Sequence, residues 1–365
     1  MTARVTLLST NLARGGAETQ VAQLAAGLRR RDWDVSVVSM VTPTAFQREL
    51  ADAGVAVFSL HMQPGVWNPL GYARLVGTLR ALRPQILHGH MFHANMLARA
   101  ARLFCPVPVV ISTLHSAAES GRGSKEVRWR DRCYRLTDPL GDLTVAVAQA
   151  VAERHVSARA VPPSKVRVIP NGVDTDCFRP DSERWERVRR ALGLGREFAW
   201  LAAGRLMWKK GYDTLLHAFA RIQEGVLLIA GSGPQEEELR SLAGENVRFL
   251  GQRDDVADLM SACDGFVQSS GVEGLPVALL EAAASGLPCV ATNAGGVGEA
   301  GSAHIVPPGD PEALAAAMRR IMALPKEERR RIGLAARGQV VARFDQVIVL
   351  GMWEELYREM LARWT

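Results

Sequence analysis

The sequence predicts an α/β protein built from two doubly wound, Rossmann-like domains. Short β-branched runs alternate with helical patterns along most of the 365 residues, which is typical of parallel sheets covered by helices on both faces. The alternation lapses once, over residues 171–196, and then restarts. The length suits two domains of about 150 residues each better than one.

The first half of the chain supplies seven strand-like runs. The first, Val5–Leu8, is followed by a glycine-rich turn and by a helix from about Ala17 whose apolar residues recur at helical spacing. A helical segment or a turn separates each run from the next, so we predict an N-terminal domain at residues 1–172. The further runs are Val35–Ser39, Val55–Ser59, Ile86–His88, Val107–Ser112, Leu143–Ala148 and Val166–Ile169.

The second half predicts a C-terminal domain at residues 173–345 and a terminal helix at 346–365. Since doubly wound sheets bind ligands beyond the carboxyl ends of their strands, we expect the two domains to face each other across a cleft. The terminal helix is expected to be a brace that packs back on the N-terminal domain or on the C-terminal one. The strand-like runs of this half are Phe198–Ala203, Val226–Ala230, Val247–Leu250, Phe266–Gln268 and Pro288–Thr292.

Composition excludes several classes of protein. Hydrophobic residues make up 48% and charged residues 22%, which is ordinary for a chain that buries a core. No stretch approaches the roughly 18 apolar residues of a membrane span, and the apolar run near the N-terminus is too short for a signal peptide. The five cysteines show no spacing typical of a disulfide framework or a zinc site. We expect a cytoplasmic protein.

The chain has a net charge of +6, and several of its basic residues are clustered in one segment that also contains Trp129 and Tyr134. A solvated helix face, an anionic membrane surface and a nucleic acid are three alternative interpretations. No nucleic-acid-binding motif accompanies the segment, so nucleic acid is not an expected partner, whereas peripheral association with the inner face of a membrane stays open. The basic residues are Arg122, Lys125, Arg128, Arg130, Arg132 and Arg135.

The densest functional signal is a Glu-Gly-Leu-Pro sequence that begins at Glu273 and follows a strand. Pro276 is expected at the first helical position, so residues 275–278, Leu275 among them, would offer free backbone N–H groups to an anion. Glu273 stands just before this helix and Glu281 in its second turn. Carboxylates there can accept paired hydrogen bonds from the vicinal hydroxyls of a sugar or ribose. A capped helix with surface acids is the alternative.

A second signal runs from Gly204 to Gly211, directly after another strand. Arg205 presents a planar fork to phosphate oxygens, and Lys210 supplies a compact point charge. Across a strand-to-helix turn, these two side chains could clamp both phosphates of a diphosphate. They would thereby neutralise the roughly two negative charges of such a leaving group.

These segments resemble glycosyltransferase family four. The resemblance rests on G-R-L-x-x-x-K-G at 204–211, on E-G-L-P at 273–276 and on the second glutamate, Glu281. It extends over nearly the whole chain, because Gly15-Gly16-Ala17-Glu18 and the Pro170-Asn171-Gly172 junction also match. It implies retaining enzymes of the GT-B architecture, which use a nucleotide sugar as a substrate, with no cofactor and no metal.

The resemblance also implies a role for each matched residue of the second domain. Arg205 and Lys210 would hold the diphosphate, together with the backbone at Leu275. Glu281 would bind the ribose hydroxyls, and Glu273 the hydroxyls of the transferred sugar. Arg253 is expected either near the nucleotide base or in a surface ion pair.

In the first domain, Gly16 would let the backbone approach the donor or acceptor closely. Gly15 and Asn171 would line the acceptor side. His115 falls where the family places a histidine that touches the donor sugar, and a structural histidine is the alternative. The family often follows that histidine with an acid, but this chain has Ser116, so the sequence does not identify the residue that orients His115.

His88, His90 and His93 form an H-x-H-x-x-H cluster at a strand end. A metal site, a lining for the cleft and a plain structural role are the alternatives. No acid or cysteine in the segment completes a metal site, so we assign His90 and His93 to the acceptor side of the cleft. Asp174-Thr175-Asp176 spells the D-x-D metal motif of another architecture, but its place after Asn171-Gly172 predicts a cap or turn.

The predicted function is therefore retaining transfer of a sugar from a UDP-linked donor to an acceptor hydroxyl. The expected partners are the nucleotide sugar and a carbohydrate or lipid-linked acceptor, as in the assembly of polysaccharides or glycolipids. A sugar-nucleotide epimerase of the same architecture and a non-catalytic sugar-nucleotide-binding relative are the alternatives.

Overall fold

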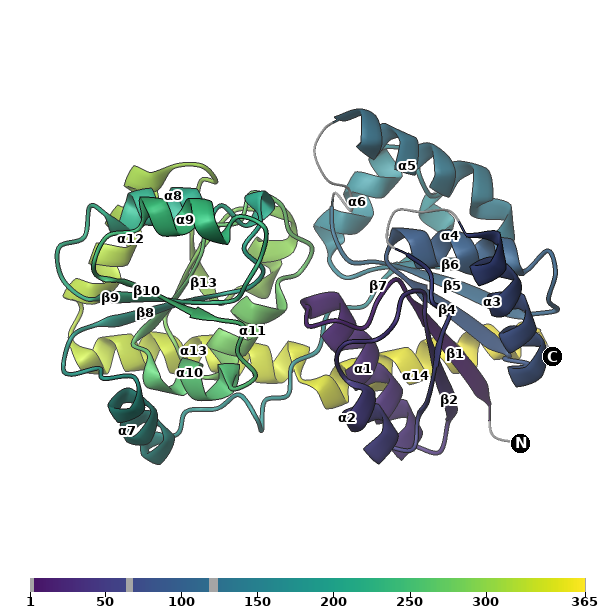
Figure 1. Ribbon diagram of the computed structural model, residues 1–365, viewed down its shortest axis with the longest axis horizontal. Helices are drawn as coiled ribbons and strands as arrows, with labels where there is room; N and C mark the ends of the chain where they lie inside the picture. Colours follow the sequence, from purple (N-terminus) through teal and green to yellow (C-terminus); the bar gives the residue numbers. More distant parts are fainter. Residues whose placement is uncertain (1–2, 64–67, 118–123, 365) are drawn as a thin grey trace. The chain divides into compact units, whose positions relative to one another are not determined.

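The computed structural model describes residues 3–63, 68–117 and 124–364. The chain forms two compact units: the first comprises Met1–Pro170 and Val347–Thr365, and the second Asn171–Gln346. Each unit is a parallel sheet with helices on both faces (Figure 1). The prediction of two doubly wound, Rossmann-like domains is thus confirmed. Arg122, one of the basic residues noted above, lies outside the described residues.

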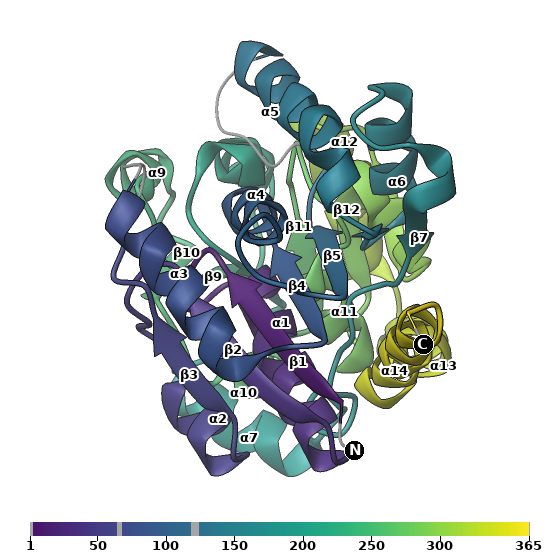
Figure 2. The same cartoon turned by 90° about the vertical axis from the view of Figure 1, so that its right-hand side faces the viewer.

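The first unit contains a seven-stranded sheet with the order β3-β2-β1-β4-β5-β6-β7. Figure 2 shows β3, β2, β1, β4 and β5 of this sheet side by side in that order. All neighbouring strands are parallel. The strand order reverses between β1 and β4, and such a reversal is where doubly wound sheets bind ligands. The strands are β1 (Arg4–Ser9), β2 (Asp34–Ser39), β3 (Ala56–Ser59), β4 (Ile86–His90), β5 (Val109–Leu114), β6 (Leu143–Ala146) and β7 (Val166–Val168).

Both faces of this sheet are buried, because successive residues of each strand point to opposite sides. Leu7 belongs to the core beneath α1 (Gly16–Arg30) and α14 (Gln346–Ala362). Leu8 belongs to the core beneath α3 (Pro69–Leu82) and α4 (Phe92–Ala101). The remaining helices of the unit are α2 (Gln47–Asp52), α5 (Ser124–Thr137), α6 (Gln149–Ser157), η1 (Asp138–Leu140) and η2 (Pro163–Lys165).

Helix α14 returns the chain to the first unit and braces it. Trp353 and Tyr357 are buried in the same core as strand β1. Nε1 of Trp33 donates a hydrogen bond to Oε1 of Glu354 at 2.9 Å, and Arg31 forms an ion pair with the same carboxylate. The rings of Tyr357 and Trp33 pack edge to face, with their centroids 5.7 Å apart. Apolar packing and a paired charge therefore hold α14 in place together.

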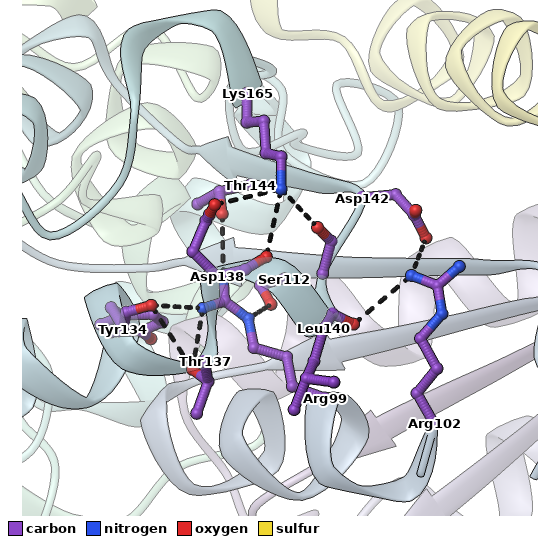
Figure 3. A network of polar contacts seen from close by, with 11 residues as sticks. Arg99, Arg102, Ser112, Tyr134, Thr137, Asp138, Leu140, Asp142, Thr144 and Lys165 are labelled. Atoms are coloured by element: carbon purple, nitrogen blue, oxygen red, sulfur yellow. Dashed lines mark hydrogen bonds and ion pairs between the residues drawn. The ribbon is translucent and has the colours of Figure 1, made fainter.

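A buried arginine ties α4 to the strands and to α5 (Figure 3). The Arg99 side chain donates to the hydroxyls of Ser112, Thr137 and Thr144 at 3.0 to 3.1 Å. It also donates to the backbone oxygen of Tyr134 at 3.0 Å. Because Arg99 is only 1% exposed, these acceptors replace the water that its guanidinium loses on burial. The network fixes where β5 ends relative to α4 and α5.

The second unit contains a six-stranded parallel sheet with the order β10-β9-β8-β11-β12-β13. Its order reverses between β8 and β11, so the two sheets share one topology. Strand β13 was not predicted from the sequence. The strands are β8 (Ala199–Ala203), β9 (Val226–Ala230), β10 (Val247–Gly251), β11 (Gly265–Gln268), β12 (Cys289–Thr292) and β13 (Ala303–Val306).

Three helices of the second unit share one core with the strands: α8 (Tyr212–Phe219), α9 (Glu236–Leu242) and α12 (Pro311–Ala323). The opposite face carries α10 (Val256–Ala262), α11 (Val277–Ala284) and α13 (Lys326–Phe344) (Figure 1). Helix α7 (Ser182–Ala191) packs on α10 and falls in the stretch where no element was predicted. Two 3₁₀ helices complete the unit, η3 (Trp208–Lys210) and η4 (Gly295–Ala300). Across the described parts of both units, none of the helices combines the length and the apolar character needed to cross a membrane.

Candidate active site

The strongest cluster of predicted residues in the second unit lies at the reversal of the strand order. Strand β8 runs into the turn that carries Arg205 and Lys210, and its neighbour β11 runs into the loop that carries Glu273. The carboxyl ends of parallel neighbours share one edge of the sheet. The fold therefore brings together two motifs more than 60 residues apart.

Glu273 and Lys210 form a close ion pair. Nζ of Lys210 donates to Oε1 of Glu273 at 2.6 Å, and Oγ of Ser270 donates to the same oxygen at 2.7 Å. Glu273 is only 8% exposed, so this charged donor and this hydroxyl stabilise a carboxylate that has lost most of its water. Within the described residues, Oε2 of Glu273 makes no hydrogen bond and is open to a ligand.

The loop that carries Glu273 is held from one side by the turn after β8. The backbone N–H of Gly271 donates to the oxygen of Lys209 at 2.9 Å, and Oγ of Ser269 donates to the oxygen of Lys210 at 3.0 Å. Gly211 has φ +61°, and a Cβ there would lie 2.3 Å from the backbone oxygen of Ser269. Both the conformation and the close approach require glycine.

Glycines after β12 hold the same loop from the other side. Gly295 has φ +57°, and a Cβ there would lie 2.1 Å from the oxygen of Glu273. The N–H of Gly296 donates to the oxygen of Gly274 at 2.7 Å. Thr292 Oγ1 donates to the oxygen of Ser270 at 2.6 Å. The backbone is thus fixed on both sides, which positions the Glu273 carboxylate before any ligand binds.

Helix α11 begins one residue later than predicted. Pro276 has ψ 116°, an extended value, so it is the N-cap residue and the helix starts at Val277. No side chain caps this end, which leaves its first N–H groups to water or to a ligand. Nδ2 of Asn171 donates to the oxygen of Leu275 at 2.6 Å. Asn171 therefore supports the loop before α11, a contact that its predicted place on the acceptor side did not suggest.

Glu281 lies on α11 and differs from Glu273 in its surroundings. Within the described residues, its carboxylate takes part in no hydrogen bond or ion pair. The side chain is partly accessible, but burial raises its pKa to about 7 because no nearby group offsets the lost hydration. An added pair of hydroxyl donors would favour its charged form.

The two predicted arginines behave differently. Arg205 is exposed, and within the described residues its guanidinium has no hydrogen bond or ion pair, so it is available to an anion. Arg253 forms a bidentate pair with Asp255 at 2.7 and 2.6 Å. This pair raises the pKa of Arg253 and lowers that of Asp255. Of the two alternatives for Arg253, the structure shows the ion pair, and a contact with the base stays a prediction.

The two predicted glycines of the first unit lie after β1, where helix α1 begins. Gly15 precedes α1 and Gly16 begins it, and both are exposed. Gly15 has no side chain to cap the helix, and the carboxylate of Glu18 lies close to it, because a Cβ on Gly15 would be 2.4 Å from Oε2 of Glu18. The close approach of a ligand to Gly16 stays a prediction.

The histidines lie at the same sheet edge, on the strands next to β1. Ser9 of β1 is in register with His90 of β4, and His90 with Thr113 of β5, two residues before His115. Nδ1 of His90 lies 3.1 Å from Nε2 of His115. Burial lowers the pKa of His115 to about 4, and it lowers the pKa of His90 well below the usual value, with a further contribution from His88 and His115.

The H-x-H-x-x-H cluster does not converge on one point. Both ring nitrogens of His88 are engaged at 2.6 Å, Nδ1 with Oη of Tyr357 and Nε2 with Oγ1 of Thr113. His90 is buried and His93 is exposed on α4. Throughout residues 3–63, 68–117 and 124–364, no group of three or more His, Cys, Asp or Glu side chains could hold a metal ion.

Two further observations bear on the sequence predictions. Oδ1 of Asp174 accepts hydrogen bonds from the N–H groups of Asp176 and Cys177 at 3.1 and 2.9 Å. This confirms that the D-x-D sequence forms a turn. Ser270 was not predicted, although it contacts the central carboxylate. Only its position three residues before Glu273 in a turn could have suggested it.

Comparison with known proteins identifies the family. The family model described as "Glycosyl transferases group 1" matches residues 197–323, and the one described as "Glycosyltransferase Family 4" matches residues 14–177. The protein of Bacillus subtilis strain 168 that is named "Putative glycosyltransferase EpsF" is 30% identical over 312 residues, or 79% of this chain and 78% of EpsF. The UDP-Gal:alpha-D-GlcNAc-diphosphoundecaprenol alpha-1,3-galactosyltransferase of Escherichia coli is 29% identical over 237 residues, 60% of each protein.

Solved structures show the same fold. The structure of Anabaena HepE in complex with UDP and glucose has a TM-score of 0.87 with this chain at 23% identity, and the match covers 98% of this chain and 100% of HepE. A sucrose-phosphate synthase of Thermosynechococcus elongatus has a TM-score of 0.85 at 22% identity, with 99% of this chain and 100% of the synthase covered. Given the family matches in both units and the likeness to EpsF over most of each chain, this chain belongs to glycosyltransferase family four and has the GT-B fold.

Proposed function

We propose that this chain transfers a sugar from a nucleoside diphosphate donor to an acceptor hydroxyl. The observation that carries the proposal is the fixed loop at the β8/β11 edge. There a lysine and a buried carboxylate meet at 2.6 Å, beside an uncapped helix N-terminus and an exposed arginine. Cationic groups and free N–H groups suit a diphosphate, and a carboxylate with an open oxygen suits sugar hydroxyls.

Each side chain has a distinct part in this proposal. Arg205 and Lys210 bind the diphosphate, with the backbone from Leu275 onward. Glu281 accepts hydrogen bonds from the ribose hydroxyls, and Oε2 of Glu273 accepts them from the transferred sugar. For the first unit, we propose that His115 contacts a sugar hydroxyl and that the backbone at Gly15 and Gly16 approaches a substrate.

The bond between the anomeric carbon and the diphosphate oxygen breaks, and a bond from that carbon to the acceptor oxygen forms. We propose that the acceptor attacks from the face that the diphosphate leaves, which retains the anomeric configuration. The departing phosphate then takes the proton of the acceptor hydroxyl. NMR of the product's anomeric proton tests this step, and an inverted product would contradict it.

The positive charges of Arg205 and Lys210 offset the negative charge of the leaving diphosphate. We therefore propose that the reaction needs no bound metal or other cofactor. Activity is expected to persist in excess chelator. If the chelator abolishes activity and magnesium restores it, this part of the proposal is wrong.

UDP is the proposed nucleotide of the donor. The printed names of the Escherichia coli galactosyltransferase and of the HepE complex both include it. A thermal-shift screen of UDP- and GDP-linked sugars tests the choice, since a ligand at 100 times its Kd stabilises a protein by about 2.7 kcal/mol. Transfer is then assayed with the donor that stabilises most. Stabilisation by no nucleotide sugar would contradict the proposed function.

For the acceptor, we propose a carbohydrate or lipid-linked sugar used in polysaccharide or glycolipid assembly, met at the cytoplasmic face of a membrane. Helix α5 supports a membrane contact. Its inner face is occupied by internal pairs, such as the bidentate one between Asp131 and Arg154 at 2.6 and 2.8 Å. Its outer face carries cations beside apolar side chains, which is typical of a helix on an anionic surface. The exposed residues of this outer face are Lys125, Arg128, Trp129, Arg132 and Leu136. Arg135 is also exposed but donates to the backbone oxygens of Ala158 and Arg159.

Vesicle co-sedimentation tests the membrane contact. Binding to vesicles that contain an anionic phospholipid is expected at low salt and should weaken as salt screens the charges. The triple variant Lys125→Gln, Arg128→Gln and Arg132→Gln should lose this binding. Equal binding of the parent and the triple variant would contradict the contact.

Binding of UDP is expected to be coupled to a proton on Glu281. In the free protein its pKa is raised to about 7, and the proposed bonds to ribose need the charged carboxylate. Below pH 7 binding must expel a proton, so the affinity for UDP should fall about eightfold between pH 7.5 and pH 6. Calorimetric titration at both pH values measures this change.

The variant Glu281→Gln is the control for that titration. It keeps the shape of the side chain but cannot titrate, so its smaller pH dependence reports the titration of UDP itself. An equal pH dependence in the variant and the parent would show that Glu281 does not bind the ribose.

A further inference from the structure

The place of the Arg205 side chain is set by the backbone on either side of it. In the part of the chain that the structure describes, its exposed guanidinium has no hydrogen bond or ion pair that would orient it. A long side chain loses rotamer entropy when it binds an anion, and a fixed backbone limits this loss. The contacts of the residues before and after Arg205 therefore decide how well it can bind a diphosphate.

The residue after Arg205 is fixed by the turn that follows β9. The N–H of Leu206 donates to the oxygen of Ser232 at 3.0 Å, and the oxygen of Leu206 accepts from the N–H of Gln235 at 3.2 Å. A Cβ on Gly233 would lie 2.3 Å from the oxygen of Leu206, so the two turns are in direct backbone contact. Because the Leu206 side chain is also fully buried, the chain cannot shift at this point without losing several contacts.

The residue before Arg205 is held differently, because a side chain completes its contacts. The N–H of Gly204 donates to the oxygen of Ala230 at 2.9 Å, and Oη of Tyr212 donates to the oxygen of Gly204 at 3.1 Å. Gly204 has φ +147°, and a Cβ on Gly231 would lie 2.0 Å from its oxygen. The carbonyl of Gly204 is therefore both closely packed and hydrogen-bonded.

Tyr212 is in a fixed place from which it can hold this carbonyl. It is the first residue of α8 and is 5% exposed, and its ring belongs to the core that α8 shares with the strands. Burial raises the pKa of Tyr212, with a further contribution from Glu273, so the hydroxyl keeps its proton and can donate it. The hydrogen bond closes the turn between the end of β8 and the start of α8.

We propose that Tyr212 is a positioning residue for Arg205: its hydroxyl holds the carbonyl of Gly204 and thereby fixes the backbone from which Arg205 reaches the diphosphate. The contact of Arg205 with a diphosphate rests on the proposed function. The hydrogen bond and its effect on the turn do not depend on that function.

Hydrogen exchange tests whether Tyr212 holds the turn. Tyr212→Phe keeps the ring in the core and removes only the hydroxyl, so it should fold, and thermal unfolding checks this. We expect the amides of Gly204 and Leu206 to exchange about fivefold faster than in the parent, the effect of one lost hydrogen bond. The amides of β5 should exchange at the parental rate. Unchanged exchange of both turn amides would overturn the proposal.

Tyr72→Phe is the matched control. Oη of Tyr72 on α3 is buried and, among the described residues, has no hydrogen-bond partner, so this change removes a hydroxyl without breaking a hydrogen bond. It should alter neither the exchange of the turn amides nor the binding of UDP. If Tyr72→Phe accelerated exchange at the turn as much as Tyr212→Phe, the effect would not be specific and the proposal would be wrong.

Calorimetric titration with UDP tests the consequence for binding. Tyr212→Phe should weaken the binding of UDP about fivefold, because the ligand must restore the order that the hydroxyl supplies in the parent. The kcat/KM for the donor should fall by a similar factor, with the KM for the acceptor unchanged. A lower kcat with an unchanged affinity for UDP would place the role of Tyr212 at Glu273 and would overturn the proposal.

A double variant separates positioning from general damage. If Tyr212 acts through Arg205, then Tyr212→Phe should not weaken UDP binding further in a protein that already carries Arg205→Gln. Equal losses of affinity in both backgrounds would contradict the proposal. If the parent binds no UDP while Tyr212→Phe still accelerates exchange at the turn, the proposed function fails and the role of Tyr212 in holding the turn stands.

Discussion

Replacement of Glu273 by glutamine is expected to lower the kcat of sugar transfer by about 10²- to 10³-fold. Glutamine keeps the size of the side chain but removes the charge that holds Lys210 at 2.6 Å and that strengthens hydrogen bonds from the sugar. The affinity for UDP should change by less than about threefold, because the proposed nucleotide contacts belong to other residues. Initial rates and calorimetry with UDP measure the two effects.

The control is Glu237→Gln, which removes the same charge from an exposed position on α9. It should transfer sugar at the parental rate. A Glu273→Gln variant that is as active as this control would show that the carboxylate does not serve the reaction. A variant that loses UDP binding and activity together would place Glu273 at the nucleotide.

Replacement of Lys210 by methionine is expected to lower kcat/KM by about 10³-fold and also to destabilise the protein. The donor loses a cation at the diphosphate. In addition, the Glu273 carboxylate, only 8% exposed, keeps Ser270 but loses its charged partner. Removing one partner of a buried pair costs up to about 3–5 kcal/mol. Transfer kinetics and thermal unfolding of the same preparation measure both losses.

The double variant Lys210→Met, Glu273→Gln distinguishes these two losses. It should unfold at a higher temperature than Lys210→Met, because it no longer buries an unpaired charge, yet it should be no more active. Lys209→Met is the control for the lysine change and is expected to stay within about threefold of the parental rate. A double variant less stable than both single variants would contradict the role given to the ion pair.

Much of the fold follows from local pattern. Every predicted strand-like run overlaps a strand of the structure, because strands buried on both faces are nearly continuous apolar runs. Two of the elements that were not predicted lack that signal. Helix α7 is highly charged and has only Val188 and Arg189 buried, and β13 is a four-residue edge strand with exposed residues. Neither contributes enough apolar surface to be recognised from its own sequence.

The candidate site was predictable only where its residues share a motif. Lys210 and Glu273 each stand in a recognisable segment, and parallel topology brings the segments together. His90 and His115 are 25 residues apart in the sequence, yet their rings are in contact. Nothing in either segment indicates which ring nitrogens lie close together. Arg253 has two acidic neighbours in sequence, Asp254 and Asp255, and only the folded structure shows that it pairs with Asp255. Register and side-chain direction are properties of the folded chain.

The return of α14 to the first unit has a consequence for synthesis on the ribosome. The N-terminal strands emerge first, but the helix that covers them with Trp353 and Tyr357 emerges only after residues 171–346 have been translated. At about 5–20 residues per second, this delay is on the order of 10 to 35 seconds. During it the nascent first unit exposes an apolar face, and His88 lacks its bond to Tyr357. The domain that starts first is completed last, so a chaperone that shields this face would act in that interval.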